Sequence, residues 1–190
     1  MIPILSCKVA EAAPGVALHV RPIGAGDVLD QLDSGEADVA LTRLVDGGQR
    51  FKCVRVTDDD YVALLDRQHP VATLGEFTLE HLARIPYVIM TSGDDDTGFV
   101  NDALDNLGLS RKIIMHVPLL SIVLMLVGFD RLGILPRRPA NGLAAVCPLV
   151  VKELPFTSPR TELSMIWHRG LDNVPAQRWL RGMVRASVHG

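Results

Sequence analysis

The stretch DVLDQLDSGEADVALTRL, residues 27–44, joins an amphipathic helix to a short apolar strand. Val28, Leu29 and Leu32 share one helical face, and Gly35 follows where a helix C-terminus favours glycine. The next residues, DVALTRL, are mostly apolar, as in a buried strand. A helix that leads at once into a strand is typical of α/β proteins, so this stretch predicts an α/β fold with a parallel sheet.

The same alternation continues along the chain. Val16, Leu18 and Val20 alternate with less apolar residues and predict a strand whose apolar side faces the core. Apolar residues at helical spacing predict further helices at residues 3–13, 78–86, 98–108, 118–128 and 175–187, with a helix or turn at 137–146. Extended runs predict strands at residues 16–23, 38–44, 51–57, 61–67, 87–90, 112–117, 132–135, 149–156 and 161–169.

The composition is that of a packed protein: of 190 residues, 48% are hydrophobic and 22% charged. A formal net charge of -3 gives no overall attraction to nucleic acid. Cys7, Cys53 and Cys147 form no metal-binding pattern and suit a reducing compartment. The N-terminus does not read as a signal peptide, and the most apolar segment, residues 117–129, is shorter than the roughly 20 residues of a membrane span. We therefore expect a cytoplasmic protein without membrane contact.

Six segments, taken together, resemble one family: EAAPGVALHVRPI, DVLDQLDSGEADVAL, DRQHPVA, TLEHLARIP, GFDRLGILPRRPA and PAQRWLRGMV. In this order they cover nearly the entire chain, which resembles the effector-binding domain of LysR-type transcriptional regulators, in particular the nodulation-protein-D-like subgroup. The resemblance implies a type 2 periplasmic-binding-protein fold, in which two α/β lobes are joined by two crossover strands. Lobe I is then expected at residues 1–65 and 164–190, and lobe II at residues 66–163.

The resemblance also implies a function. In this family a cytoplasmic homodimer binds a small inducer in the cleft between the lobes and thereby controls transcription, so we expect an inducer-sensing domain. Two alternatives stay open. One is an extracytoplasmic solute-binding protein of similar fold, which would need an export signal; the other is a non-functional truncated remnant.

The N-terminus differs from the family pattern. LysR-type regulators begin with a winged helix-turn-helix and a linker helix, and their effector domain begins with a strand. This sequence starts on the first helix, so we expect an N-terminally truncated fold that binds DNA only through a helix-turn-helix absent from these residues. Because the first strand of a doubly wound sheet lies centrally, its absence predicts a gap in the sheet of lobe I.

The acidic segment TSGDDDTGFV, residues 91–100, does not match a calcium-binding loop. Counted from its first aspartate, an EF-hand needs glycine where Phe99 stands and glutamate where Asp105 stands. We therefore expect no metal ion. Asp96 or Thr97 is better suited to cap the helix that follows.

Candidate effector contacts follow from the family mapping and from the rule that ligands of open α/β sheets bind at the carboxyl ends of the strands. The candidates are Thr91, Ser92, Gly93, Val117 and Pro118 in lobe II, and Arg21, Ala25 and Arg43 in lobe I. Either arginine suits an inducer carboxylate or phenol, and equally a surface salt bridge with a neighbouring acid. The acidic segment disfavours a strongly anionic effector, and the apolar helix after residue 117 favours a neutral or aromatic one.

Catalytic motifs are missing from the sequence, which contains neither GxSxG, nor HExxH, nor GxxxxGK[ST]. Its six histidines show no metal-ligand spacing. We therefore expect neither an enzyme nor a cofactor. Arg178, Arg181 and Arg185 share one face of the last predicted helix and are expected to be solvated.

Overall fold

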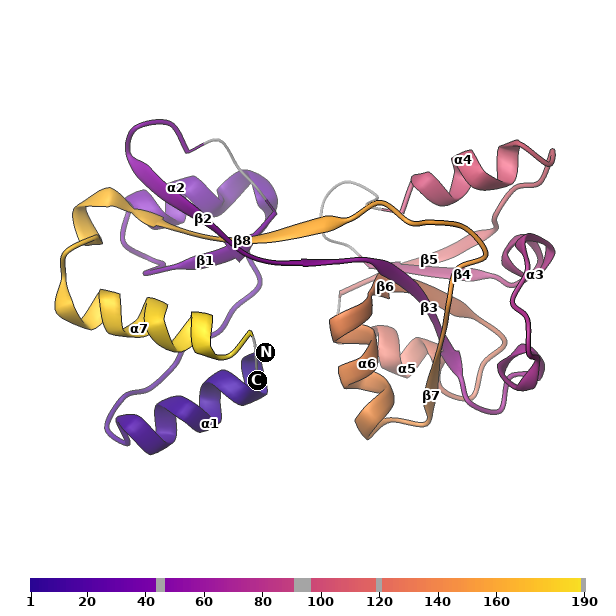
Figure 1. The fold of residues 1–190 in the computed structure, drawn as a ribbon, viewed down its shortest axis with the longest axis horizontal. Helices are drawn as coiled ribbons and strands as arrows, with labels where there is room; N and C mark the ends of the chain where they lie inside the picture. Colours follow the sequence, from indigo (N-terminus) through magenta and orange to yellow (C-terminus); the bar gives the residue numbers. More distant parts are fainter. Residues whose placement is uncertain (44–46, 91–96, 119–120, 189–190) are drawn as a thin grey trace. The chain divides into compact units, whose positions relative to one another are not determined.

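The computed structural model describes residues 1–43, 47–90, 97–118 and 121–188, and of Ala25 the backbone alone. The chain forms two compact units (Figure 1). Unit 1 consists of residues 1–58 and 162–190, and unit 2 of residues 59–161.

The first unit boundary lies seven residues before the end predicted for lobe I, residue 65. Strand β3 (Tyr61–Asp66) belongs to unit 2 because it pairs with β6 (Leu132–Pro136) and β7 (Leu149–Lys152), which both lie there. The chain therefore changes unit at the end of strand β2 (Phe51–Asp59) and again at the start of β8 (Thr161–His168).

Unit 1 contains a three-stranded sheet in the order β1-β8-β2, in which β1 is Ala40–Thr42. Strand β1 runs antiparallel to β8, with Leu41 opposite Met165. Helices α1 (Ile2–Ala12) and α7 (Pro175–Ala186) lie side by side (Figure 1). A 3-10 helix, η1 (Ala25–Asp27), leads into helix α2 (Val28–Asp33).

Successive residues of β8 point to opposite faces of this sheet, which gives unit 1 two cores. On one face, β8 packs against α1 and α7 through the buried residues Leu5, Val9, Met165, Trp167 and Val184. On the other face it packs against α2 through Val28, Leu32, Ala40, Phe51 and Ile166. Helix α2 and the α1–α7 pair therefore cover opposite faces.

The strand predicted at residues 16–23 is wrong. These residues form neither a helix nor a strand of either sheet. Val16 and Val20, predicted to face inward, are 47% and 60% exposed, whereas Leu18 packs partly against the core of α1 and α7. Alternation of apolar residues is only one requirement for a strand, because each strand also needs a neighbour for its backbone hydrogen bonds.

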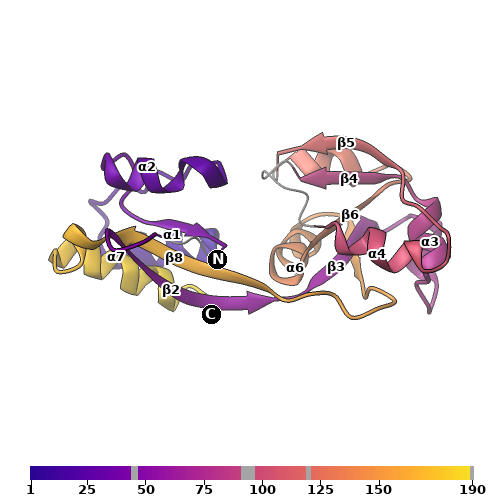
Figure 2. The ribbon, with the colours of Figure 1, turned by 90° about the horizontal axis from the view of Figure 1, so that it is seen from above.

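Unit 2 contains a five-stranded sheet in the order β5-β4-β6-β3-β7 (Figure 2). Strand β4 (Tyr87–Met90) is parallel to β5 (Ile113–Val117) and to β6, whereas β3 is antiparallel to both of its neighbours. The sheet is therefore mixed, and the prediction of a parallel sheet holds only for β5, β4 and β6. Helices α3 (Leu79–Arg84) and α4 (Phe99–Asp105) pack into one of its two cores, and α5 (Ile122–Leu126) and α6 (Arg137–Val146) into the other.

The predicted helices of unit 2 differ in accuracy. The helix predicted at residues 78–86 is confirmed as α3, and Thr78 caps it. The Thr78 hydroxyl accepts from His81 N at 3.4 Å, and His81 Nδ1 accepts from Thr78 N at 3.1 Å. The cap predicted for α4 was Asp96 or Thr97; Asp96 lies outside the described residues, and the N-cap is Gly98 instead of Thr97. The described residues also include the short 3-10 helices η2 (Pro70–Thr73) in unit 2 and η4 (Arg169–Leu171) in unit 1.

Candidate functional site

The carboxyl ends of β4 and β5 meet at one edge of the sheet of unit 2. The two strands are parallel and in register at their ends, with Met90 opposite Val117. Met90 and Val117 are therefore neighbours although they are far apart in sequence; Met90 precedes one predicted site segment, and Val117 begins the other. Thr91, Ser92 and Gly93 themselves lie outside the described residues.

The two described candidates at this edge differ in exposure. Val117 is 6% exposed, and its side chain packs in the core formed with α5 and α6. Pro118 is exposed, and its carbonyl accepts from Ser121 N at 2.9 Å, in the turn that precedes α5. Pro118 is thus accessible to a ligand, whereas the side chain of Val117 is buried in the core beneath this edge of the sheet.

Arg111 holds the start of helix α4, and sequence reasoning missed it. Its Nη1 donates to Thr97 Oγ1 at 2.6 Å and its Nε donates to Asn101 Oδ1 at 2.7 Å. Its guanidinium carbon lies 5.6 Å from the centre of the Tyr87 ring. Tyr87 is fully buried, its hydroxyl has no hydrogen-bond partner among the described residues, and this burial raises the pKa of the hydroxyl. No local motif marks Arg111, because its partners come from a helix and a strand that precede it.

The candidates of unit 1 lie apart from one another. Arg21 Nη2 donates to the backbone carbonyl of Glu36 at 2.8 Å and lies 3.4 Å from the Glu36 carboxylate, so this arginine makes the surface salt bridge that its sequence context left open. Arg43 is exposed and directly follows β1. Ala25 begins η1, and its side chain lies outside the described part of the structure.

A buried hydroxyl lies opposite the carboxyl end of β1. Thr42, the last residue of β1, pairs with Ser164 of β8. Ser164 is fully buried, and its Oγ has no hydrogen-bond partner among the described residues. No sequence pattern marks this group, because serine in an extended run is common on either face of a strand.

A charged cluster fixes the N-terminus of α6 to the strands beside it. Arg137 Nε donates to Asp60 Oδ1 at 2.8 Å, and its Nη2 donates to Glu153 Oε2 at 2.7 Å. Hydrogen bonds from Arg137 lower the pKa of both carboxyls, and the two carboxylates raise the pKa of Arg137. Asp59 accepts from the backbone N–H of Arg138 at 2.8 Å. Asp59 at the end of β2 and Asp60 just after it thus hold α6 in place.

A second set of buried polar contacts joins the end of β3 to the turn before β6. Asp66 Oδ2 accepts from Gly128 N at 2.6 Å, and its Oδ1 accepts from Gln68 N at 2.6 Å. These two N–H groups, that of Gly128 first, lower the pKa of the Asp66 carboxyl. His69 is buried, bonds Asp130 through Nε2, and accepts from Val71 N at 3.1 Å through Nδ1.

In unit 1, Arg181 leaves the solvated face predicted for the α7 arginines and is 7% exposed. It donates to the carbonyls of Leu171 and Asp172 at 3.3 and 2.7 Å, and its guanidinium carbon lies 4.6 Å from the centre of the Trp167 ring. Hydrogen bonds, above all from Lys52, lower the pKa of the Asp172 carboxyl. Arg178 and Arg185 are exposed, as predicted.

The described residues contain neither a candidate metal site nor a candidate membrane span. Within residues 1–43, 47–90, 97–118 and 121–188, no group of three or more histidine, cysteine, aspartate or glutamate side chains could hold a metal ion. No helix in the same part of the chain has the length and apolar character of a membrane span.

Two α/β units connected by the neighbouring strands β2 and β8, with candidate contacts at the carboxyl ends of strands, are typical of a domain that binds small molecules. The chain belongs to the family of the LysR substrate binding domain, whose family model matches residues 7–188. The fold is that of the regulatory domains of LysR regulators, which have a type 2 periplasmic-binding-protein-like architecture, so the fold class predicted from the sequence is confirmed.

The similar proteins are transcriptional regulators. The chain is 30% identical over 190 residues to the HTH-type transcriptional regulator SyrM of Rhizobium meliloti (strain 1021), covering 99% of this chain and 58% of SyrM. It is 24% identical to the HTH-type transcriptional activator NagR of Ralstonia sp, covering 95% of this chain and 60% of NagR. The chain thus spans about half the length of the curated relatives it matches.

Solved structures agree with the sequence relatives. The regulatory domain of MexT, a transcriptional activator in Pseudomonas aeruginosa, superposes with a TM-score of 0.86 at 29% identity and covers 98% of this chain and 92% of its own. A putative transcriptional regulator from Vibrio parahaemolyticus gives a TM-score of 0.85 at 27% identity, with 98% and 87% covered. These relatives are regulators and not enzymes, and they give no support to the alternatives of a solute-binding protein or a remnant.

Proposed function

We propose that this chain is the inducer-sensing domain of a LysR-type transcriptional regulator and that a small-molecule effector contacts the carboxyl ends of β4 and β5. The observation that carries the proposal is the register of these parallel strands, with Met90 opposite Val117, in a chain that belongs to a substrate-binding family. Residues 91–93 follow Met90 in the sequence, residues 117–118 begin at the end of β5, and ligands of open α/β sheets bind at the carboxyl ends of the strands. Units 1 and 2 correspond in this proposal to lobes I and II.

A neutral or aromatic effector suits the described residues of this proposed site. Val117 and the core of α5 and α6 beneath it are apolar. In unit 1, the guanidinium of Arg21 is already occupied by Glu36, so it does not offer a free charge to a carboxylate ligand. A strongly anionic effector would therefore have to displace an existing ion pair before this arginine could bind it.

Thermal unfolding with added ligands tests the proposal. Neutral phenols and related aromatic compounds should raise the melting temperature, because a ligand present at 100 times its Kd stabilises the native state by about 2.7 kcal/mol. Thr91→Val and Ser92→Ala should remove this shift, whereas Thr73→Val, an exposed threonine of η2 in the same unit, should keep it. Stabilisation by di- or tricarboxylates alone would contradict the proposed effector class, and a full shift in Thr91→Val and Ser92→Ala would contradict the site.

We also propose that the domain forms a homodimer through the open edge of β5. Among the described residues, β5 pairs with β4 on one side and with no strand on the other. Ile113 and Ile114 of this strand are each 39% exposed. An exposed apolar edge strand offers unpaired backbone groups to another chain, so in a stable protein it is usually covered. A second copy would cover it.

The mass of the protein in solution, measured by light scattering, tests the dimer. The wild type should be a dimer, and Ile114→Asp should be a monomer because a carboxylate would be buried in the contact. Leu107→Asp is the matched control, since Leu107 is 54% exposed in the same unit but lies outside β5. A dimeric Ile114→Asp variant would show that another surface makes the contact.

DNA binding is not proposed for these residues. The substrate-binding domain accounts for residues 7–188, and the relatives are named as HTH-type regulators. In a regulator that carries this domain, we propose that DNA is bound only by the helix-turn-helix and that the whole molecule acts in the cytoplasm, where the DNA is. A gel-shift by these 190 residues alone would contradict this division of roles.

A further inference from the structure

Two hydroxyl groups lie side by side at the carboxyl end of β1. Thr42 is the last residue of β1 and stands directly opposite Ser164 of β8. In an antiparallel pair, the Cβ atoms of two opposite residues are about 4.5–5.5 Å apart, and their side chains point to the same face of the sheet. The two hydroxyls are therefore close enough to form a hydrogen bond after a side-chain rotation. We call Thr42 and Ser164 the hydroxyl pair.

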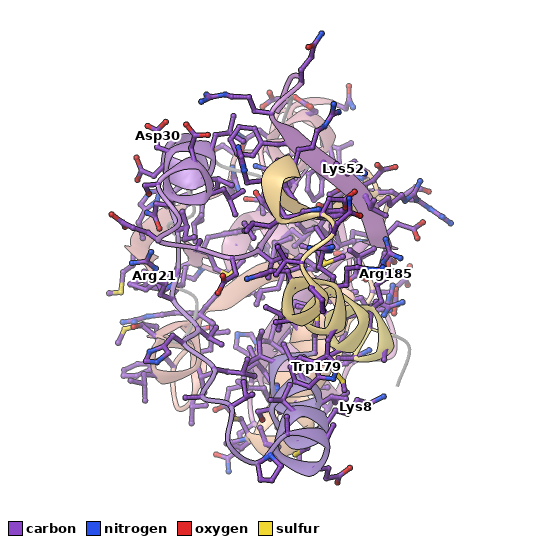
Figure 3. The ribbon with its side chains drawn as sticks, turned by 90° about the vertical axis from the view of Figure 1, so that its left-hand side faces the viewer. Lys8, Arg21, Asp30, Lys52, Trp179 and Arg185 are labelled. Atoms are coloured by element: carbon purple, nitrogen blue, oxygen red, sulfur yellow. The ribbon has the colours of Figure 1, made fainter. Side chains whose placement is uncertain are left out.

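The hydroxyl pair lies on the face of the sheet that α2 covers. Ala40 and Ile166, which also stand opposite each other, belong to the core beneath α2. Because side chains along a strand alternate between the two faces, Thr42 and Ser164, each two residues further along, point to this same face. In Figure 3 it is the side of unit 1 on which Asp30 of α2 lies. The apolar core beneath α2 thus ends in two polar groups.

Neither hydroxyl of the pair makes a hydrogen bond to another described residue. Ser164 is fully buried, whereas Thr42 is half-buried and remains accessible at the surface. A buried polar group without a partner lowers the stability of the fold, and alanine at position 164 would avoid this loss. The structure of the free domain therefore gives the Ser164 hydroxyl no role.

Position in the sheet distinguishes Ser164 from Tyr87, whose buried hydroxyl also lacks a partner among the described residues. Tyr87 is the first residue of β4, so it lies at the amino end of its strand. Ser164 stands opposite the last residue of β1, at the carboxyl end. Ligands of open α/β sheets bind outside the carboxyl ends of the strands, so Ser164 and not Tyr87 lies on the side that a ligand approaches.

The chemistry of the hydroxyl group suits a shared contact. A hydroxyl has one donor hydrogen and two acceptor lone pairs, so Thr42 can serve two partners at once. Its oxygen can accept from Ser164 Oγ while its hydrogen is donated to an oxygen of a ligand. The buried hydroxyl then gains the partner that it lacks in the free domain. Two neutral hydroxyls supply no positive charge, so the matching ligand group is a hydroxyl or carbonyl oxygen and not a carboxylate.

We propose that Thr42 recognises a hydroxyl or carbonyl oxygen of the effector and that Ser164 is a positioning residue, which acts through Thr42. This inference rests on the proposed function, since it requires an effector, but it concerns residues of unit 1 alone. It extends the proposed function by naming the chemical group that the effector carries. A neutral aromatic compound with a hydroxyl or carbonyl substituent meets both requirements.

Isothermal titration calorimetry with phenol and toluene tests the proposal, because the two compounds are similar in size and differ in the hydroxyl group. The wild type should bind phenol about tenfold more tightly than toluene, since a site that bonds a hydroxyl leaves its own polar group unpaired with the other compound. Thr42→Val keeps the shape of the side chain and should remove this preference. Its affinity for toluene should equal that of the wild type.

Ser164→Ala separates a positioning role from a structural one. A serine that only supported the fold would lower the melting temperature when replaced. The alanine variant should instead melt at the same temperature as the wild type or higher, because it lacks the unpaired hydroxyl. Its preference for phenol should fall by about threefold, because Thr42 loses the group that orients it. Tyr87→Phe is the matched control: it also removes a buried unpaired hydroxyl and should keep the full preference.

The outcomes separate this proposal from the proposed effector site of unit 2. A preference for phenol that persists in Thr42→Val would overturn the role of the hydroxyl pair, and so would equal binding of phenol and toluene by the wild type. Either result would leave the site of unit 2 standing, because Ser92→Ala tests that site separately. If neither compound binds the wild type, the neutral aromatic effector class is wrong, and the role of the hydroxyl pair is refuted with it.

Discussion

Replacing Asp66 should destabilise unit 2 through the loss of two charge-assisted hydrogen bonds. The carboxylate is 6% exposed and accepts at 2.6 Å from the N–H groups of both Gln68 and Gly128. Hydrogen bonds to a charged group contribute about 1.5–3 kcal/mol each, but Gln68 and Gly128 are exposed, so water can reach the N–H groups after the change. We therefore expect Asp66→Ala to cost about 2–4 kcal/mol and Asp66→Asn, which keeps one acceptor oxygen, about 1–2 kcal/mol.

The dependence on pH identifies the cause. The folded pKa of Asp66 is lowered, so its charge stabilises the fold above the unfolded pKa of about 4, and this stabilisation is lost as the pH falls through the folded pKa. The difference in unfolding free energy between wild type and Asp66→Asn should be constant from pH 7 to about pH 5 and shrink below it. Glu76→Gln, a change at an exposed acid of the same unit, is the control.

Urea unfolding followed by far-ultraviolet circular dichroism is the appropriate assay. Both tryptophans, Trp167 and Trp179, lie in unit 1, so their fluorescence reports on the wrong unit. The variants should shift the circular dichroism transition more than the fluorescence transition. A difference between wild type and Asp66→Asn that stays the same down to about pH 3, or one no larger than that of Glu76→Gln, would refute the reasoning.

Five other substitutions should give distinct results in thermal unfolding. Tyr87→Phe removes a buried hydroxyl without a partner among the described residues and should leave stability unchanged or raise it by about 1 kcal/mol; a loss of more than that would mean the hydroxyl is paired. Gly133→Ala places a Cβ 2.9 Å from Ile122 Cδ1 and should cost about 1–3 kcal/mol, whereas Gly142→Ala, with open space around it in α6, should stabilise by about 0.5–1 kcal/mol. Arg181→Ala should cost about 2–4 kcal/mol and alter the fluorescence of Trp167, and Arg185→Ala should change stability by less than about 0.5 kcal/mol.

Elements with local signals were predictable from the sequence. Thr78 marks the start of α3 because its hydroxyl accepts a hydrogen bond from the backbone N–H of His81, three residues further on. Pro175 marks the start of α7, where the missing N–H costs nothing. Such signals need no knowledge of the rest of the chain.

Elements that depend on distant neighbours were predicted less well. Residues 16–23 have the alternation of a strand but no strand beside them, and a sequence pattern does not contain that information. The helix predicted at residues 118–128 is described only as Ile122–Leu126, because Val127 leaves the helical conformation at ψ 123° and Gly128 adopts a φ of +77°. Leu124, in the most apolar segment of the sequence, is 69% exposed.

The candidate site was predicted as a set of chain positions and not as a set of contacts. The family mapping led to residues 91–93 and 117–118, and the register of β4 and β5 makes Met90, which precedes the first segment, a neighbour of Val117. Whether each contacts an effector stays a prediction. Arg21 could not be assigned from the sequence because its partner Glu36 lies 15 residues away, and Arg111 escaped notice for the same reason.

The order in which the chain is synthesised favours unit 2. Unit 2 is a single run of residues, 59–161, whereas unit 1 needs residues from both ends of the sequence. Lys8 Nζ of α1 donates to the carbonyl of Ala186 at the end of α7, at 2.9 Å. Both helices also pack into the same hydrophobic core. During translation, all residues of unit 2 are therefore synthesised before α7. Leu5 and Val9 of α1 cannot pack against α7 until translation is nearly finished. Cells that produce this domain thus need to protect its first helix for longer than any other part.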